Sequence, residues 1–277
     1  CGMRTPPVIV NETLLNNKFD LVTMLGDIHI AQTLQTTGGS TSLHPVDRQY
    51  AQLGATLSPV ARTSKLHATI QQYFNATKRG GSNTPSRMSQ NTKTGTQLLQ
   101  LWEVKRHGEA QRFHRLFGSV GNRRLLWHGT NVAVAAAILK TGLRIMPTAT
   151  TGSRVGRGIY LASEAAKSEM YCRTARVGKQ RHGLLFLCEA PLGRAHYIHR
   201  DDWTLTKAPQ GFDSVIAQGR QEPNARMDTA LDLDGHDVTV AQAGPVPTRV
   251  SSHFDQSEYL VYREAQCCIR FVARCQF

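Results

Sequence analysis

Three polar residues stand inside stretches that otherwise have the composition of buried strands. His128 lies near the end of RLLWHGT, Tyr160 lies within GRGIYLA, and Glu258 leads the apolar run of SEYLVY. Each has a structural explanation when taken singly: a bonded strand-end histidine, a core tyrosine and a solvated glutamate. Acting together, a carboxylate, an imidazole and an aromatic ring could hold a polar ligand and stabilise positive charge developing on it. Whether they act together depends on the elements that position them.

The second part of the chain alternates short strands with short helices. Its apolar and β-branched runs predict strands over 98–106, 124–129, 158–162, 183–190, 257–262 and 267–277. The segments between them predict helices over 108–116, 131–141 and 163–172. No internal repeat is present, and the order is too irregular for a doubly wound parallel sheet. We therefore expect an α+β fold.

The first eighty residues have helical periodicity instead. Within 12–35, after a candidate N-cap at Asn11, apolar residues recur every three or four positions, which predicts an amphipathic helix. These positions are Leu15, Phe19, Val22, Leu25 and Ile28. Further helices are expected over 46–57 and 64–78, and no strand pattern is found, so this part is expected to be all helical. Residues 79–96, rich in Ser, Thr, Asn and Gly, are predicted to be a linker or a long loop.

Composition limits the partners. The 277 residues carry a net charge of +13, and ten Lys and Arg residues between 78 and 124 face only Glu103 and Glu109. Such a segment either attracts polyanions or forms a solvated basic surface, and charge alone does not separate the two. No apolar run reaches the roughly 18 residues of a membrane span. The six cysteines form no CxxC pair, and the histidines of HYIH at 196–199 lack a third ligand, so neither disulfides nor a metal is expected.

Five motifs, in this order, resemble the catalytic domain of the poly(ADP-ribose) polymerases, a family of ADP-ribosyltransferases with a His-Tyr-Glu triad. They are RLLWHGT, GLRI, GRGIYLA, AKSEMYC and SEYLVY. The resemblance covers residues 97–277, and residues 1–78 resemble the C-terminal part of the helical regulatory domain that precedes it in the family. Stretches such as LLWHGTN, GFDSVIAQG and QSEYLVY are most similar to a DNA-break-dependent branch that mainly attaches single ADP-ribose units.

The resemblance implies a reaction and the residues that carry it. NAD would be the co-substrate, nicotinamide would leave, and Glu258 would be the catalytic carboxylate, completed by His128 and Tyr160 as a triad. A glutamate beside the ribose suits this chemistry because the bond breaks through an oxocarbenium-like state. The residues expected to bind NAD are His128, Gly129, Arg144, Gly158, Tyr160, Lys167, Ser168 and Tyr171.

The family pattern also implies what each binding residue does. His128 and the backbone of Gly129 would hold a ribose hydroxyl and the nicotinamide amide, because a glycine lets a ligand reach the main chain. The rings of Tyr160 and Tyr171 would sandwich the nicotinamide. Ser168 would donate to the carboxamide, Lys167 would assist Glu258, and Arg144 would lie near the adenosine and phosphates.

Departures from the family pattern are conservative in kind. Thr130, Arg157 and Leu161 replace the usual serine, lysine and phenylalanine, and they retain a hydroxyl, a charge and apolar bulk. None of them is a triad member, so activity is not put in doubt. The segment 146–156 is a short version of the loop that borders the donor site, which we expect to affect inhibitor selectivity more than catalysis.

The resemblance also implies binding partners and a cellular location. We expect protein acceptors modified on Glu, Asp or Ser side chains, or DNA ends, in a nuclear, monomeric protein without membrane contact. DNA breaks would be recognised by a missing N-terminal region, since no zinc finger or tryptophan-glycine-arginine motif is present. The helical segment 1–78 would be truncated and would inhibit only weakly.

Two other functions stay open from the sequence. One is chain-forming poly(ADP-ribose) synthesis. The other is a catalytically silent module that binds nucleic acid or ADP-ribose through the basic middle segment. The retention of Glu258 beside the other triad residues favours catalysis.

Overall fold

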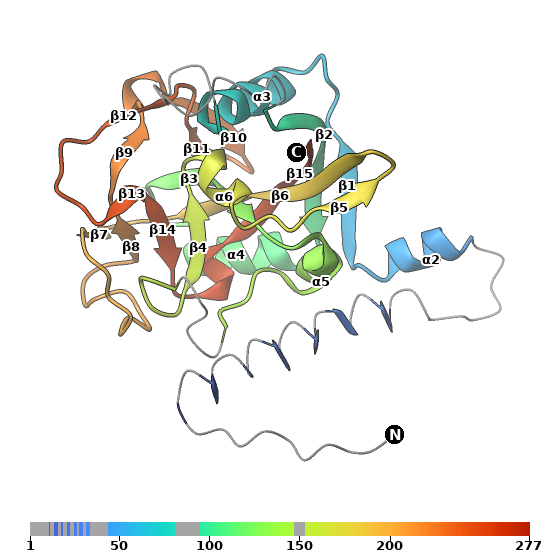
Figure 1. Ribbon diagram of the computed structural model, residues 1–277, viewed down its shortest axis with the longest axis horizontal. Helices are drawn as coiled ribbons and strands as arrows, with labels where there is room; N and C mark the ends of the chain where they lie inside the picture. Colours follow the sequence, from blue (N-terminus) through green and yellow to red (C-terminus); the bar gives the residue numbers. More distant parts are fainter. Residues whose placement is uncertain are drawn as a thin grey trace.

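The computed structural model describes residues 44–80, 95–146 and 153–277, with single positions between 11 and 33 (Figure 1). The described positions from Leu14 to Thr33 are helical, and the Asn11 side chain accepts a 2.8 Å hydrogen bond from the Leu14 N–H, as an N-cap should. Phe19 of the predicted apolar positions lies outside the described residues, as do most of the predicted linker 79–96 and much of the segment 146–156.

A large mixed sheet forms the centre of the molecule. In spatial order its strands are β1 (Ala55–Pro59), β2 (Gln97–Arg106), β15 (Cys268–Gln276), β6 (Gln180–Pro191), β3 (Arg123–Gly129), β4 (Ile159–Ala162), β14 (Glu258–Val261), β8 (Ser214–Ala217) and β7 (Ala195–Ile198). Two further pieces attach to it: β5 (Ala175–Val177) pairs with β6, and the hairpin of β10 (Thr229–Leu233) and β11 (His236–Val240) joins β3. Strand β14 is thereby held between β4 and β8.

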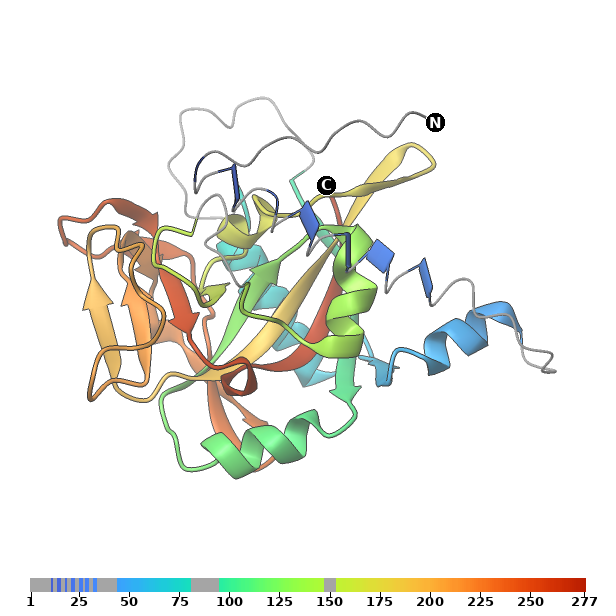
Figure 2. The same ribbon diagram turned by 90° about the horizontal axis from the view of Figure 1, so that it is seen from below.

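The remaining elements surround this sheet (Figures 1 and 2). A second sheet has the order β12 (Pro245–Pro247), β9 (Gly219–Pro223), β13 (Phe254–Gln256). The helices are α2 (Pro45–Ala51), α3 (Lys65–Thr77), α4 (Glu109–Phe117), α5 (Ala135–Thr141) and α6 (Ala165–Glu169), with 3-10 turns η1 (Val132–Val134), η2 (Ala225–Met227) and η3 (Glu264–Gln266). This arrangement confirms the expected α+β class.

The expectation of a strand-free N-terminal part was wrong. The helix predicted over 46–57 ends at Ala51, and Ala55–Pro59 pairs antiparallel with β2. Gly54, at φ 62°, turns the chain into a backbone region that glycine adopts freely, and this ends the helical path. The strand itself depends on hydrogen bonds from a partner more than forty residues away, which a local sequence pattern does not contain. Helix α6 is likewise shorter than the helix predicted over 163–172.

Helix α3 packs on the same sheet, although it was assigned to the regulatory part of the chain. The fully buried Trp127 of β3 lies with its ring centroid 5.0 Å from that of Tyr73 and 5.8 Å from that of Phe74. Leu66, Ile70 and Phe74, spaced by four residues, face this core, and Ile70 and Phe74 are fully buried. The position of β3, and so of His128 next to Trp127, depends on this helix.

We expect Phe74→Ala to destabilise the folded chain by about 3–5 kcal/mol, because it leaves a cavity against Trp127. Urea unfolding followed by tryptophan fluorescence measures the change. Asn75→Ala on the exposed side of the same helix is the matched control and should change the free energy of unfolding by less than about 0.5 kcal/mol. Equal stability of the two variants would mean that α3 does not support the sheet.

Candidate active site

A cavity of about 270 Å³ opens between β3, β4, α5, α6 and the start of β14. Its wall contains every residue that the sequence analysis assigned to the site: His128, Gly129, Arg144, Gly158, Tyr160, Lys167, Ser168, Tyr171 and Glu258. Apolar side chains of Val134, Ile138 and Leu143 form another part of the wall. Residues from five separate motifs therefore face one space, and their individual roles stay predictions.

Glu258 is buried and paired with Lys167. Its side chain is 3% exposed, and its Oε1 lies 2.7 Å from Lys167 Nζ. A buried carboxylate requires such a partner, because burial without one carries a large desolvation penalty. Burial lowers the pKa of Lys167, but the interaction with the Glu258 carboxylate raises it by more than burial lowers it. The pKa of Lys167 therefore lies above its usual value, and the ammonium stays charged. The pair fixes a negative oxygen at the wall of the cavity.

His128 is held by the strand next to it. Its Nδ1 lies 2.9 Å from the carbonyl oxygen of Tyr160, and a carbonyl can only accept, so Nδ1 carries the proton. Burial lowers the pKa of His128, and the hydrogen bond to that carbonyl offsets only part of the effect. The imidazole is therefore neutral at pH 7, and its Nε2 is an acceptor suited to a hydroxyl group.

Tyr160 anchors the loop that enters β4. Its hydroxyl donates to the Gly156 carbonyl at 2.7 Å and accepts from the Val155 N–H at 2.9 Å. Burial raises the pKa of Tyr160, so the phenol stays protonated. Tyr171, the second predicted stacking ring, is 47% exposed, and Lys167 Nζ lies 5.8 Å from its ring centroid. One ring is thus fixed and the other is open to solvent.

Gly129 is required by the packing of α6 on β3. A Cβ at this position would lie 1.8 Å from the carbonyl oxygen of Ser168, closer than any real contact. This glycine was expected for ligand access, and in the structure no side chain would fit at its position. Because Ser168 and Lys167 belong to the same short helix, the missing Cβ also sets how close Lys167 comes to Glu258.

Glu164, just before the N-terminus of α6, was not among the residues expected in the site. The residue is 2% exposed, and its carboxylate accepts hydrogen bonds of 2.9 Å from Gln221 Nε2 of β9 and Gln256 Nε2 of β13. The pKa of Glu164 is raised to about 7, chiefly by burial and also by the nearby Glu222 carboxylate. The hydrogen bonds from the two glutamines and the charge of Lys167 oppose this rise. Glu164 thereby ties the helix of Lys167 to the strand that leads into Glu258. Its only sequence signal is its place just before AKSEMYC.

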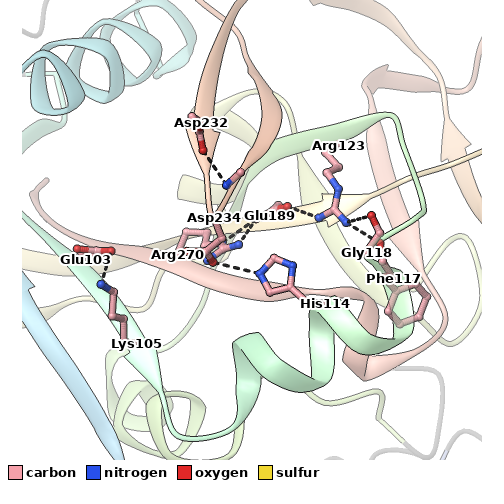
Figure 3. A network of polar contacts seen from close by, with 11 residues as sticks. Glu103, Lys105, His114, Phe117, Gly118, Arg123, Glu189, Asp232, Asp234 and Arg270 are labelled. Carbon is pink, nitrogen blue, oxygen red and sulfur yellow. Dashed lines mark hydrogen bonds and ion pairs between the residues drawn. The ribbon is translucent and has the colours of Figure 1, made fainter.

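Part of the charge of the basic middle segment is neutralised inside the molecule. Arg106 pairs with Glu109, and Arg124 lies 3.8 Å from Asp228. Arg123 pairs with the fully buried Glu189, which also receives a 2.7 Å bond from Arg270 (Figure 3). These three arginines stabilise the fold and are not available to a polyanion, whereas Arg112 and Arg115 of the same segment are exposed.

Two further predictions concern metals and membranes. Within residues 44–80, 95–146 and 153–277 no group of three or more His, Cys, Asp or Glu side chains is arranged to hold a metal ion. The histidines of HYIH contact protein groups: His199 Nε2 lies 3.0 Å from Gln218 Oε1, and the His196 ring packs on Phe212. None of the helices in the described part of the chain is long and apolar enough to cross a bilayer.

Comparison with known proteins identifies the family. Residues 68–277 match the poly(ADP-ribose) polymerase catalytic domain, and residues 1–50 match the regulatory domain of the same family. The chain belongs to the poly(ADP-ribose) polymerase family, as the five motifs indicated. The expected boundaries at residues 78 and 97 stay predictions.

Individual relatives refine the comparison. The protein named protein mono-ADP-ribosyltransferase PARP3 is 43% identical in both Mus musculus and Homo sapiens, over 279 and 278 residues, 98% of this chain in each case. Poly [ADP-ribose] polymerase 2 of Homo sapiens is 32% identical over 280 residues, 100% of this chain. The chain spans 50%, 49% and 45% of these three relatives, about half of their length.

We expect Glu164→Gln to remove a pH dependence of stability. The pKa of Glu164 is raised from 4.5 to about 7 on folding, so the fold favours the protonated form. Stability then falls as pH rises from about 4.5 to about 7, by about 3 kcal/mol in total, and is level above that. The glutamine variant cannot titrate, so its melting temperature should fall less between pH 5 and pH 7.

Differential scanning fluorimetry across pH 5–8 measures this, with Glu103→Gln as the control. Glu103 is an exposed partner of Lys105 on β2, and its loss should leave the wild-type slope in place. An unchanged slope in Glu164→Gln would mean that this carboxyl is already ionised in the folded state at pH 5.

Proposed function

We propose that this chain is the catalytic part of an NAD-dependent ADP-ribosyltransferase, which releases nicotinamide and transfers ADP-ribose to an acceptor. The observation that carries the proposal is the buried Glu258 carboxylate, paired with Lys167, in the same cavity as His128, Tyr160 and Tyr171. The fixed anion can stabilise a ribosyl cation, and the neutral imidazole can accept a hydrogen bond from a ribose hydroxyl. The aromatic rings can stack on an aromatic leaving group.

The binding roles follow from the state of each group. His128 Nε2 would accept a hydrogen bond from a ribose hydroxyl, because its Nδ1 proton is already engaged. Tyr160, fixed by its hydroxyl, would form one side of the nicotinamide site, and the open Tyr171 would close the other. Gly129 and Ser168 would hold the carboxamide, and the exposed Arg144 would lie along the adenosine and phosphates.

The chemical step breaks the bond between the ribose C1′ and the nicotinamide nitrogen. The bonding electrons leave with nicotinamide, and positive charge develops on the ribose as an oxocarbenium-like state. The Glu258 carboxylate stabilises this charge and orients the ribose hydroxyls. The acceptor oxygen then bonds to C1′; a hydroxyl acceptor passes its proton to the Glu258 carboxylate in this step, whereas a carboxylate acceptor has none to lose.

We propose a single ADP-ribose unit as the product. This rests on the relatives at 43% identity being named mono-ADP-ribosyltransferases, whereas the relative named a poly(ADP-ribose) polymerase is 32% identical. The proposed acceptors are Glu, Asp or Ser side chains of proteins, or DNA ends, within the response to DNA strand breaks in the nucleus. Chain elongation is the runner-up product.

We expect Glu258→Gln to reduce ADP-ribose transfer from labelled NAD about 100- to 1000-fold, because it removes the charge that faces the developing cation. Tyr160→Ala should chiefly raise KM, since it removes a stacking surface and releases the loop at 155–156. Products separated on a gel distinguish a compact band, expected for single transfer, from a ladder, which would mean chain elongation.

Asp237→Asn is the matched control, because this carboxylate is exposed and lies outside the cavity wall. It should transfer as the wild type does. An absence of transfer by the wild type, while a nicotinamide-like inhibitor still raises its melting temperature, would contradict the proposal and support a silent binding module.

A further inference from the structure

The hairpin of β5 and the start of β6, residues 173–182, extends beyond the body of the sheet (Figures 1 and 2). Its strands pair in the register Ala175 with His182 and Val177 with Gln180, across a turn at Gly178 with φ 63°. A Cβ at Gly178 would meet nothing within 4 Å, so the tip is open to solvent. We call this segment the basic hairpin.

Its charge is of one sign. The sequence RTARVGKQRH contains Arg173, Arg176, Lys179 and Arg181 and no acidic residue, and all four basic side chains are exposed. None of the ion pairs found in the described part of the chain includes any of them. This distinguishes the hairpin from the basic middle segment, where arginines such as Arg106 and Arg123 meet buried carboxylates.

Two of these charges oppose each other directly. Arg176 and Arg181 are cross-strand partners in the antiparallel register, so both side chains leave the same face of the ribbon. Like charges directly opposite each other destabilise a strand pair. Arg181 Nε donates to Thr174 Oγ1 at 3.0 Å, which orients the guanidinium but leaves its charge in place. The arrangement lowers the stability of the hairpin, and a bound anion would relieve it.

The basic hairpin begins next to the candidate active site. Arg173 follows Tyr171 of the cavity wall by two residues. Strand β6 continues from the hairpin into the sheet, where Leu185 pairs with Gly129. Leu185 is four residues beyond Arg181, about 13 Å along an extended strand. A polyanion held by the hairpin would therefore lie near the strand that pairs with Gly129 of the cavity wall.

We propose that the basic hairpin binds the sugar-phosphate backbone of nucleic acid. Three of its four charges are arginines, whose planar guanidinium groups match phosphate oxygens in pairs. A two-stranded ribbon is narrow enough to enter a DNA groove, and contacts to phosphates give affinity without sequence preference. The catalytic part of the chain would then contact nucleic acid directly, and a bound strand would lie beside the residues proposed to bind NAD.

The test is a fluorescence anisotropy titration of the full 277-residue chain with a labelled blunt duplex of about 20 base pairs, from 50 to 200 mM salt. The triple variant Arg176→Gln/Lys179→Gln/Arg181→Gln should bind at least about tenfold more weakly, and its slope of log affinity against log salt should be shallower by about 2–3. Arg112→Gln/Arg115→Gln/Lys207→Gln removes the same charge from other exposed positions and should stay within about twofold of the wild type.

A single change separates binding from folding. Arg176→Glu places opposite charges across the strands, so we expect the melting temperature to hold or rise while duplex affinity falls. Equal losses in the two triple variants, or duplex binding unchanged by the hairpin variants, would overturn the proposal. Tighter binding of a poly-glutamate peptide than of the duplex, lost in the hairpin triple variant, would also overturn it in favour of an acidic protein partner.

Discussion

The buried ion pair between Lys167 and Glu258 is the interaction on which the candidate site depends. The two residues are distant in sequence and meet at 2.7 Å because α6 and β14 flank the same strand, β4. Ionised groups are tolerated at this depth only when they are paired, so loss of either partner leaves an uncompensated buried charge. Any change in the distance between α6 and the sheet therefore acts on the carboxylate proposed to do the chemistry.

Several contacts outside the cavity hold that distance. Gly129 lets the Ser168 carbonyl approach β3, and Glu164 ties the start of α6 to Gln221 and Gln256. On the same face of β3, Trp127 packs on α3, and Thr77 of that helix accepts a 3.2 Å hydrogen bond from the Ala165 N–H of α6. The site is thus supported by a helix, α3, that precedes the catalytic motifs by about fifty residues and that the family match begins to include at residue 68.

Much of the fold and most of the site could be predicted from the sequence. The strands around His128, Tyr160 and Glu258 are apolar runs bounded by turns, and such runs carry their own signal. Strand β1 could not be predicted, because its hydrogen bonds come from β2 and its sequence has no alternation of its own. Glu164 was missed for a related reason: its burial and its glutamine partners arise from β9 and β13, which are distant in the chain.

The basic excess of the chain also could not be interpreted from composition. Arginines of the middle segment, such as Arg123, meet buried carboxylates, whereas the charges of the basic hairpin meet none within the described residues. Pairing depends on tertiary neighbours such as Glu189, which a count of charges along the sequence does not contain. A count of charges along the sequence therefore does not show which of them remain exposed to bind a polyanion.

The most direct test of this account is a double-mutant cycle on nicotinamide release from NAD, with Lys167→Met, Glu258→Gln and the double variant. If Lys167 acts by holding the Glu258 carboxylate in place, the double variant should lose little more than Glu258→Gln alone, with a coupling free energy of about 1–3 kcal/mol in kcat/KM. Losses that simply multiply in the double variant would mean that the two residues act independently, and would contradict the account.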